Sequence, residues 1–372
     1  MARAVEFRVT PSLTIAERYD DNVLFSRSKI DDFATDATPK VLVIARGEDL
    51  DLTANLGVTR TQYAKNPELS FFSTQGGLVL KADTLTGRFL RGLGLTVTDN
   101  YVYTKDHPTF AGFATPDDPA SGGIQTGRFT SFSNNAGVTV PYVISARAQV
   151  SGSYTNSYTT FSSNSGLFNT TGHALTGGWS YLIEPQTTFL SNYTYSKFSF
   201  SGGSGGSGGS SIDTHAASVG IRRQFLKDLI VDANMGGTYV PSSDRLSPSF
   251  NIGATQKFSA TDVGLRLVRS VSSSGGLAAQ VSEREILSAF ITHRVTKAMT
   301  ATLTGNYATA TTQGTRTVDI TTYSISPGLT YDFTKWARLT ASYSYYNQRS
   351  EGAVGSGLLR NQVTVGLTIT WP

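Results

Sequence analysis

Polar and apolar residues alternate along most of this chain, and the alternating segments are long. In residues 7–15, Phe7, Val9, Leu13 and Ile15 share one face of an extended strand, and mostly polar residues occupy the other face. The same period of two returns later in the chain, in residues 50–59, 93–98 and 362–371. This period is the signature of a β-strand with one apolar and one polar face. The chain is therefore predicted to be all-β.

We count about 18 such segments of roughly 10 residues or more, which is the length of a tilted strand that crosses a bilayer. Short turns are expected near residues 47–49, 84–86, 145–147, 184–186, 227–228, 260–262, 297–298 and 334–335. Longer loops are expected at residues 20–34, 105–127, 162–170, 202–210, 241–245, 270–279, 310–317 and 348–357, with a tighter one at 66–69. This alternation predicts a transmembrane antiparallel up-and-down β-barrel in a bacterial outer membrane, with residues 1–372 forming one domain.

The apolar faces of so many long strands are too large for one protein interior to bury, so lipid is expected to cover them. No apolar run is longer than residues 41–45, far short of the roughly 20 residues that a membrane-spanning helix needs. Aromatic residues are expected to form a girdle at each boundary of the membrane. Toward the long loops the candidates are Tyr101, Tyr103, Phe132, Tyr158, Phe161, Tyr195, Phe198, Tyr239, Tyr307, Tyr343 and Tyr345. Toward the short turns they are Phe89, Tyr142, Phe225, Phe258, Tyr331, Phe333, Trp336 and Trp371.

The composition argues against several classes of function. The chain has no cysteine, and hence no disulfide, thiolate metal ligand or thiol nucleophile. The net charge of +4 is small for 372 residues and its cations are scattered, so nucleic acid is not an expected partner. The four histidines are isolated from the residue types that would form a catalytic or metal site with them. We therefore expect no enzyme activity, no cofactor and no resident metal.

Residues 202–210 read Gly-Gly-Ser three times. Such a repeat is typical of the flexible linkers that are introduced in the laboratory. It falls where the alternation predicts a long loop, so we interpret it as the engineered replacement of an extracellular loop between two neighbouring strands. The chain begins without an apolar signal segment, and we interpret it as a mature form.

The C-terminal segment, residues 364–371, resembles the β-signal that ends many outer-membrane barrels. Gly366, Ile369 and the aromatic Trp371 carry the resemblance, although Pro372 follows the aromatic residue. The resemblance implies that the barrel-assembly machinery recognises this strand by adding it to an open sheet edge. The alternative is an ordinary edge strand without a targeting role.

The opening segment, residues 11–23, resembles the start of the outer-membrane family called "putative β-barrel porin 2". In that family a first strand leads into a turn of the type Tyr-x-Asp-Asn-Val, and this chain has Tyr19 followed by Asp21, Asn22 and Val23. Members often accompany exopolysaccharide synthesis and export. The resemblance therefore implies passage of a polymer, with periplasmic export proteins as candidate partners.

The polar faces are predicted to line a lumen too wide for these side chains to fill, so water should occupy it. The charged residues assigned to that face are Arg8, Arg18, Asp51, Lys81, Arg88, Arg222, Asp232, Arg266 and Arg338. The excess of cations predicts a mild preference for anionic solutes or for sugars that carry carboxylates. The alternative is that these cations merely pair with neighbouring acids.

The predicted function is a porin-like channel for hydrophilic solutes or an exported polysaccharide, with residues 105–127 as a candidate constriction. Two alternatives remain open at this stage. The barrel could instead sheathe or anchor a partner such as a multihaem cytochrome, whose haem would come from another polypeptide because the chain has no cysteine. It could also be an engineered nanopore scaffold, although prolines within strands, such as Pro141 and Pro327, favour an edited natural protein.

Overall fold

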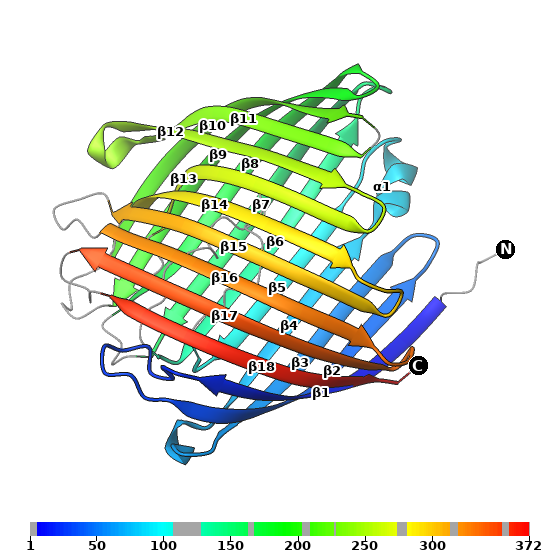
Figure 1. Ribbon diagram of the computed structural model, residues 1–372. Helices are drawn as coiled ribbons and strands as arrows, with labels where there is room; N and C mark the ends of the chain where they lie inside the picture. Colours follow the sequence, from blue (N-terminus) through cyan, green and yellow to red (C-terminus); the bar gives the residue numbers. More distant parts are fainter. Residues whose placement is uncertain are drawn as a thin grey trace.

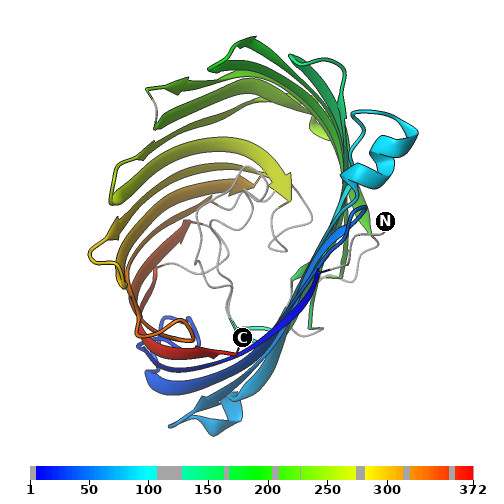
Figure 2. The same ribbon diagram turned by 90° about the vertical axis from the view of Figure 1, so that its right-hand side faces the viewer.

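The computed structural model is a closed barrel of 18 antiparallel strands (Figures 1 and 2). It describes residues 6–106, 128–162, 167–202, 209–226, 228–273, 281–312, 319–351 and 357–371. The strands are β1 (Glu6–Asp20), β2 (Asp32–Arg46), β3 (Asp51–Tyr63), β4 (Phe71–Lys81), β5 (Thr96–Thr104), β6 (Ser131–Val143), β7 (Ala148–Phe161), β8 (Phe168–Glu184), β9 (Thr187–Gly202), β10 (Ser210–Phe225), β11 (Leu229–Val240), β12 (Arg245–Lys257), β13 (Thr261–Ser273), β14 (Val281–Arg294), β15 (Met299–Thr312), β16 (Asp319–Asp332), β17 (Ala337–Glu351) and β18 (Leu358–Thr370).

Each strand pairs with the strand before it and the strand after it in the sequence, and β1 also pairs with β18. The ring is therefore closed and leaves no free sheet edge, which is the condition for a sheet to cross a membrane. The predicted fold class is confirmed. The strands β9 and β10 on either side of the Gly/Ser repeat are antiparallel neighbours, paired from Phe200 and Ser210 onward, as expected.

The connections differ in length between the two ends of the barrel, as predicted, with one correction. Residues 84–86 are not a short turn, because they lie in the helix α1 (Asp83–Phe89), within a 14-residue connection from β4 to β5. Two 3-10 helices, η1 (Pro67–Leu69) and η2 (Pro241–Ser243), lie in connections at the opposite end. The predicted loop of residues 105–127 lies outside the described residues after Asp106. No helix in the described ranges is long and apolar enough to span a membrane.

The outer surface of the barrel is apolar. Large hydrophobic side chains on the outward face are strongly exposed, among them Phe7 at 67%, Leu265 at 53% and Leu303 at 39%. Directly opposed residues of neighbouring strands share a face, so the register carries this assignment from strand to strand. The apolar side chains of the alternating pattern therefore face outward, where the hydrocarbon of the membrane surrounds them.

Exposed aromatic residues lie near both ends of the wall, including Tyr158, Tyr239 and Tyr343 toward the long loops and Phe258 and Trp336 toward the short turns. Three of the predicted girdle residues are misassigned. Phe161 and Phe198 cannot face lipid because each lies an odd number of positions from an outward tyrosine, Tyr158 or Tyr195, on its own strand. Phe89 lies in α1 instead of a strand.

Candidate functional site

The inner surface near the short turns carries opposed charges on neighbouring strands. Arg46 of β2 lies opposite Asp51 of β3, which lies opposite Lys81 of β4. Arg8 lies on the same inner face of β1, two positions from Glu6, which is directly opposite Arg46. None of these side chains forms an ion pair with another residue that the structure describes. Their charges therefore act on whatever occupies the lumen.

A second group of predicted lumen residues comes together across β10 to β13. Arg222 of β10 lies opposite Asp232 of β11, and Arg266, two strands further on in β13, reaches the same carboxylate at 3.4 Å. Arg266 also donates a hydrogen bond of 2.8 Å to the side-chain oxygen of Asn251. Its reach is possible because Gly253, which lies between Asp232 and Arg266 in the sheet, has no side chain in the way. Arg222 has no ion pair among the described residues, so this group leaves one cation open.

Two further predictions have different outcomes. Arg338 lies on the inner face and is paired with Asp332 at 2.5 Å, so it does not contribute an open charge. Arg88 was expected on the inner face of a strand, and this is wrong. It lies in α1, where it pairs with Asp49 at 2.5 Å in the turn between β2 and β3. The alternation gives no warning of this helix because its seven residues interrupt the strand pattern only briefly.

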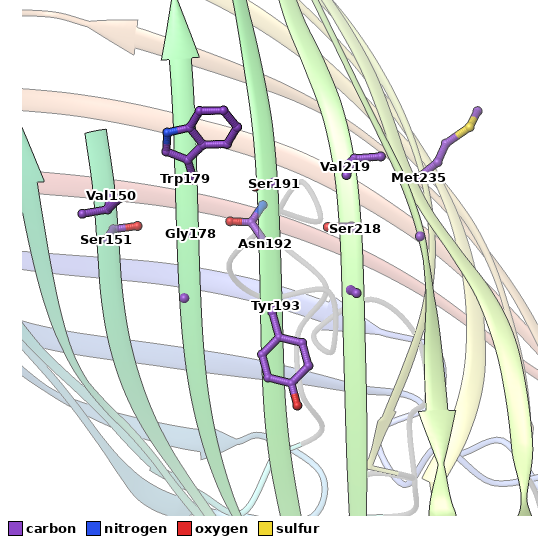
Figure 3. Close-up of a pocket in the computed structure, with 13 residues that line it drawn as sticks. Val150, Ser151, Gly178, Trp179, Ser191, Asn192, Tyr193, Ser218, Val219 and Met235 are labelled. Atoms are coloured by element: carbon purple, nitrogen blue, oxygen red, sulfur yellow. The ribbon is translucent and has the colours of Figure 1, made fainter. Parts of the chain in front are cut away.

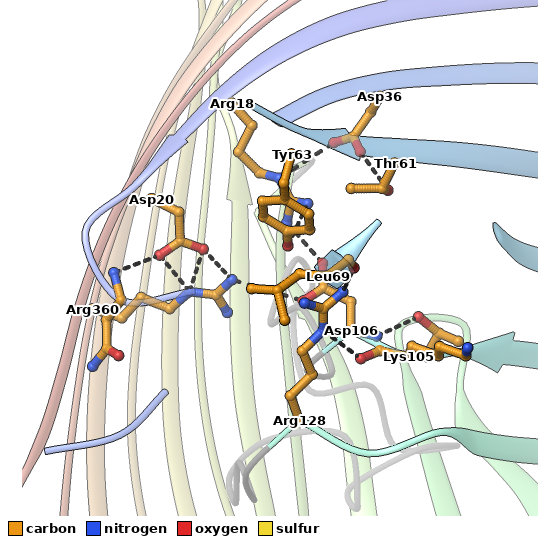
Figure 4. Close-up of polar contacts among 12 residues, drawn as sticks. Arg18, Asp20, Asp36, Thr61, Tyr63, Leu69, Lys105, Asp106, Arg128 and Arg360 are labelled. Atoms are coloured by element: carbon orange, nitrogen blue, oxygen red, sulfur yellow. Dashed lines mark hydrogen bonds and ion pairs between the residues drawn. The ribbon is translucent and has the colours of Figure 1, made fainter. Parts of the chain in front are cut away.

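At the long-loop end of the lumen, Arg18 is the centre of a buried charge cluster (Figure 4). Arg18 is only 5% exposed. The guanidinium contacts Asp36 of β2 at 3.3 Å and Asp106, which follows β5, at 2.8 Å. Asp36 also accepts a hydrogen bond of 2.6 Å from Thr61 of β3. Arg18 was predicted to face the lumen and lies on the inner face of β1, where its two partners come from separate parts of the chain, β2 and the segment after β5.

Arg360 of β18 is the second arginine of this cluster and is only 4% exposed. Its guanidinium binds the carboxylate of Asp20, with Nε 2.9 Å from one oxygen and 3.1 Å from the other. It also lies 3.9 Å from Asp106. We call Arg18, Asp20, Asp36, Asp106 and Arg360 the mouth cluster. Because a buried charge is tolerated only when it is paired, the pairing within this cluster is what allows Arg18, Asp20 and Arg360 to be buried.

Arg128, just before β6, extends the mouth cluster toward β3 and β4. Its guanidinium donates hydrogen bonds to the carbonyl oxygens of Lys105, at 3.0 Å, and of Leu69. It also lies over the rings of Tyr63, at 5.0 Å, and Phe71, at 4.9 Å. Both ends of the connection between β5 and β6 are therefore fixed to the same corner of the barrel wall, one through Asp106 and the other through Arg128 (Figure 4).

The turn that follows β1 joins the first strand to the last. The backbone N–H of Asn361 and its side-chain amide donate to Asp21 at 2.6 and 2.8 Å. The side-chain amide of Asn22 donates to the carbonyl oxygen of Leu359 at 3.0 Å. Lys29 pairs with Asp21 at 2.7 Å. The Asp-Asn-Val motif that resembles a porin family thus stabilises the seam between β1 and β18.

These contacts determine the charge state of the seam. Burial alone would raise the pKa of the Asp21 carboxyl, but hydrogen bonds from Lys29 and Asn361 outweigh burial and hold the pKa below its usual range. Asp21 is consequently an anion at neutral pH.

Among the described residues, no group of three or more His, Cys, Asp or Glu side chains is arranged to hold a metal ion.

The residues of the predicted assembly signal lie at the same seam. Gly366 faces inward between Ala16 and Thr340, and a Cβ atom there would come within 3.1 Å of the Ala16 side chain. Ile369 lies on the outward face opposite Leu13. Trp371 follows the strand, 46% exposed, and its backbone N–H donates to Pro11 at 2.9 Å. The recognition of this segment during assembly stays a prediction.

Comparison with known proteins agrees with this architecture. The family described as "Putative beta-barrel porin 2" matches residues 256–371. No curated protein sequence matches the chain at a significant level. Among solved structures, the chain is similar to the siderophore receptor PirA of Pseudomonas aeruginosa, with 9% identity over 98% of this chain and 81% of that one, and a TM-score of 0.50.

Two further solved structures from Pseudomonas aeruginosa are equally similar to this chain. OccK2 (OpdF), solved in complex with glucuronate, has 10% identity over 99% of both chains and a TM-score of 0.50. OccK1 (OpdK) has 11% identity over 98% of this chain and 99% of that one, with the same TM-score. At these identities the likeness concerns the fold. With its closed ring and apolar outer surface, the chain has the fold of an outer-membrane β-barrel and is integral to a bacterial outer membrane.

Proposed function

We propose that the barrel is a water-filled channel for hydrophilic solutes across the outer membrane. The observation that carries this proposal is the inner surface, where polar and charged side chains from all parts of the ring face inward. In barrels of roughly eight strands, side chains can fill the interior. A ring of 18 strands is wider, so the space that its side chains leave holds water. A structural sheath would not need open charges along its inner wall.

We further propose a mild preference for anionic solutes. Several inward cations have no ion pair among the residues that the structure describes, namely Arg8, Lys40, Arg46, Lys81, Arg222, Lys257 and Arg294. The inward acids without an ion pair among the described residues are Glu6, Asp51 and Asp262. In a water-filled pore with low-dielectric walls, this excess raises the local concentration of anions.

The cargo that fits this surface is a sugar or oligosaccharide that carries carboxylates. OccK2, which has a similar fold, was crystallised with glucuronate, and the resemblance to a family linked with exopolysaccharide export points to the same chemistry. Arginine binds a carboxylate through two parallel hydrogen bonds, whereas neutral sugars offer only hydroxyls. Open arginines such as Arg8 and Arg222 would therefore favour uronates over neutral hexoses.

Single-channel recording in planar bilayers tests both parts of the proposal. We expect an open channel with chloride more permeant than potassium, and a current that glucuronate blocks at lower concentration than glucose. An oligouronate should block for longer than the monomer if polymers are the natural cargo. Absence of conductance, even after residues 107–127 are deleted, would overturn the channel.

We also propose that residues 1–372 form one barrel domain and that residues 202–210 replace an outer loop. The strands on either side pair directly with each other up to the repeat, so the linker has only to connect two adjacent strand ends. Doubling its length should therefore leave both folding and conductance unchanged. A loss of conductance on lengthening would indicate that this connection contributes to the pore.

A further inference from the structure

A hollow of about 710 Å³ lies on the outer surface of the barrel, over strands β7 to β11 (Figure 3). Its floor includes Gly177 of β8 and Ala217 of β10, which lie on the outward face on either side of Tyr193. A Cβ atom added at Gly177 would meet nothing within 4 Å. The outward face is therefore hollowed at Gly177 and Ala217, between larger outward side chains such as Tyr193 and Trp179.

Apolar side chains border this hollow. Trp179, Val219 and Met235 lie in one outward row along its edge, in which Ser191 separates Trp179 from Val219, and they are 42%, 55% and 61% exposed. Figure 3 shows them projecting from the strands on the same side as Tyr193. The hollow lies within the apolar band of the wall, so hydrocarbon rather than water has access to it.

A polar row lies on the same face, nearer to the long loops. Asn156, His173, Lys197 and Asp213 are directly opposed across β7, β8, β9 and β10. The Asp213 carboxylate accepts a hydrogen bond of 2.9 Å from Tyr195, and Nδ1 of His173 is 2.8 Å from the Tyr154 hydroxyl. Lys197 is exposed and has neither a hydrogen bond nor an ion pair among the described residues.

The distance between the polar row and the hollow allows one membrane lipid to reach both, with its head group at the row and an acyl chain in the hollow. His173 and Gly177 are four residues apart on β8, or about 13 Å at 3.3 Å per residue. An anionic head group at Lys197 and His173 would therefore place its acyl chain over Gly177. The free ammonium of Lys197 complements a phosphate, and the second ring nitrogen of His173 can donate to the same group.

We propose that this face binds one lipid of the outer leaflet, with its phosphorylated head group on Lys197 and His173 and an acyl chain in the hollow over Gly177. A second copy of the chain is the competing occupant. The charge pattern favours the lipid, because the open charge of this row is a cation and Asp213 is already engaged by Tyr195. An isologous contact between copies would bring Lys197 close to an identical Lys197.

Native mass spectrometry of the full chain in a mild detergent tests the proposal, with purified lipid A as the probe and its dephosphorylated form as the comparison. We expect Gly177→Leu, which fills the hollow, and Lys197→Gln with His173→Gln, which removes the head-group contacts, each to weaken lipid A binding about tenfold or more. Dephosphorylated lipid A should bind the native chain as weakly as phosphorylated lipid A binds the Lys197→Gln, His173→Gln variant.

Matched controls lie on the other side of the barrel. Gly305→Leu fills an outward glycine of β15, and Arg349→Gln removes an outward cation of β17. Neither should change binding, and heat-modifiable migration on gels confirms that all variants fold. Equal lipid A binding by Gly177→Leu and Gly305→Leu would overturn the proposal. So would a detergent-stable dimer that Gly177→Leu converts to monomer without loss of lipid, since a second copy would then fill the hollow.

Discussion

The two ends of the lumen use charge in opposite ways. At the long-loop end, the mouth cluster buries Arg18 and Arg360 and pairs each of them with carboxylates. At the short-turn end, Arg8, Lys81 and Arg222 have no ion pair among the described residues. A paired, buried charge fixes neighbouring segments to each other, whereas an unpaired charge in a water-filled lumen leaves its field available to solutes. The first end should therefore govern stability and the second selectivity.

The largest effect is expected from breaking the mouth cluster at the seam. Arg360→Ala would leave the Asp20 carboxylate buried without its cation, which costs about 3–5 kcal/mol for a buried pair. Urea unfolding in detergent measures this loss. The matched control is Arg222→Ala, which removes an unpaired arginine of β10 and should change the free energy of unfolding by less than about 0.5 kcal/mol. Similar losses for the two variants would contradict the distinction between the two ends.

A smaller loss is expected at Asp106, which holds one end of the connection between β5 and β6. Asp106→Asn leaves Arg18 paired with Asp36 and Arg360 paired with Asp20, so neither arginine is stranded. We expect a cost of about 1–3 kcal/mol, the range for one lost charge-assisted contact. Limited proteolysis should show faster cleavage between residues 105 and 130. Asp51→Asn, at the short-turn end of the lumen, should alter neither the free energy of unfolding nor the rate of this cleavage. Faster cleavage between residues 105 and 130 in the Asp51→Asn variant would argue against a local role for Asp106.

Ion selectivity should depend on the unpaired charges at the short-turn end rather than on the mouth cluster. Arg222→Glu is expected to shift the chloride-to-potassium permeability ratio toward potassium about fivefold, since a change of ~1 kcal/mol corresponds to such a factor. The free energy of unfolding should barely change. Arg223→Glu is the ideal control because this neighbouring residue lies on the outward face of β10. Reversal potentials in a salt gradient measure both variants, and an equal shift for Arg223→Glu would exclude the assignment of faces.

The fold and the inner faces of most charged residues could be predicted because strand alternation is a local property. Once Val219 and Ile221 are assigned outward, Arg222 follows inward from its position alone. The same rule shows where the prediction failed. Phe198 was grouped with Tyr195 by its height along the strand although the two differ in parity, and the helix that carries Arg88 has no period of two.

The mouth cluster could not be predicted, because its partners are remote in the sequence. Asp20 and Arg360 are separated by 340 positions, and only closure of the ring brings them together. The nearest local signal was the Asp-Asn-Val motif after β1, which was interpreted as a turn. Its side chains contact β18, a role that depends on the register between the first and last strands.

The smallest effect is expected from titrating the seam. The pKa of Asp21 is held below its usual range in the folded barrel, so its ionised form stabilises the fold above the unfolded value of about 3.9. This contribution should disappear as the pH falls through the lower, folded pKa. Asp21→Asn cannot ionise, and the difference in urea midpoint between the native chain and this variant should shrink between pH 5 and pH 3. Other carboxylates titrate in the same range, but they do so in both proteins and cancel from the difference. A difference that stays constant with pH would mean that Asn361 and Lys29 hold the seam without help from the Asp21 charge.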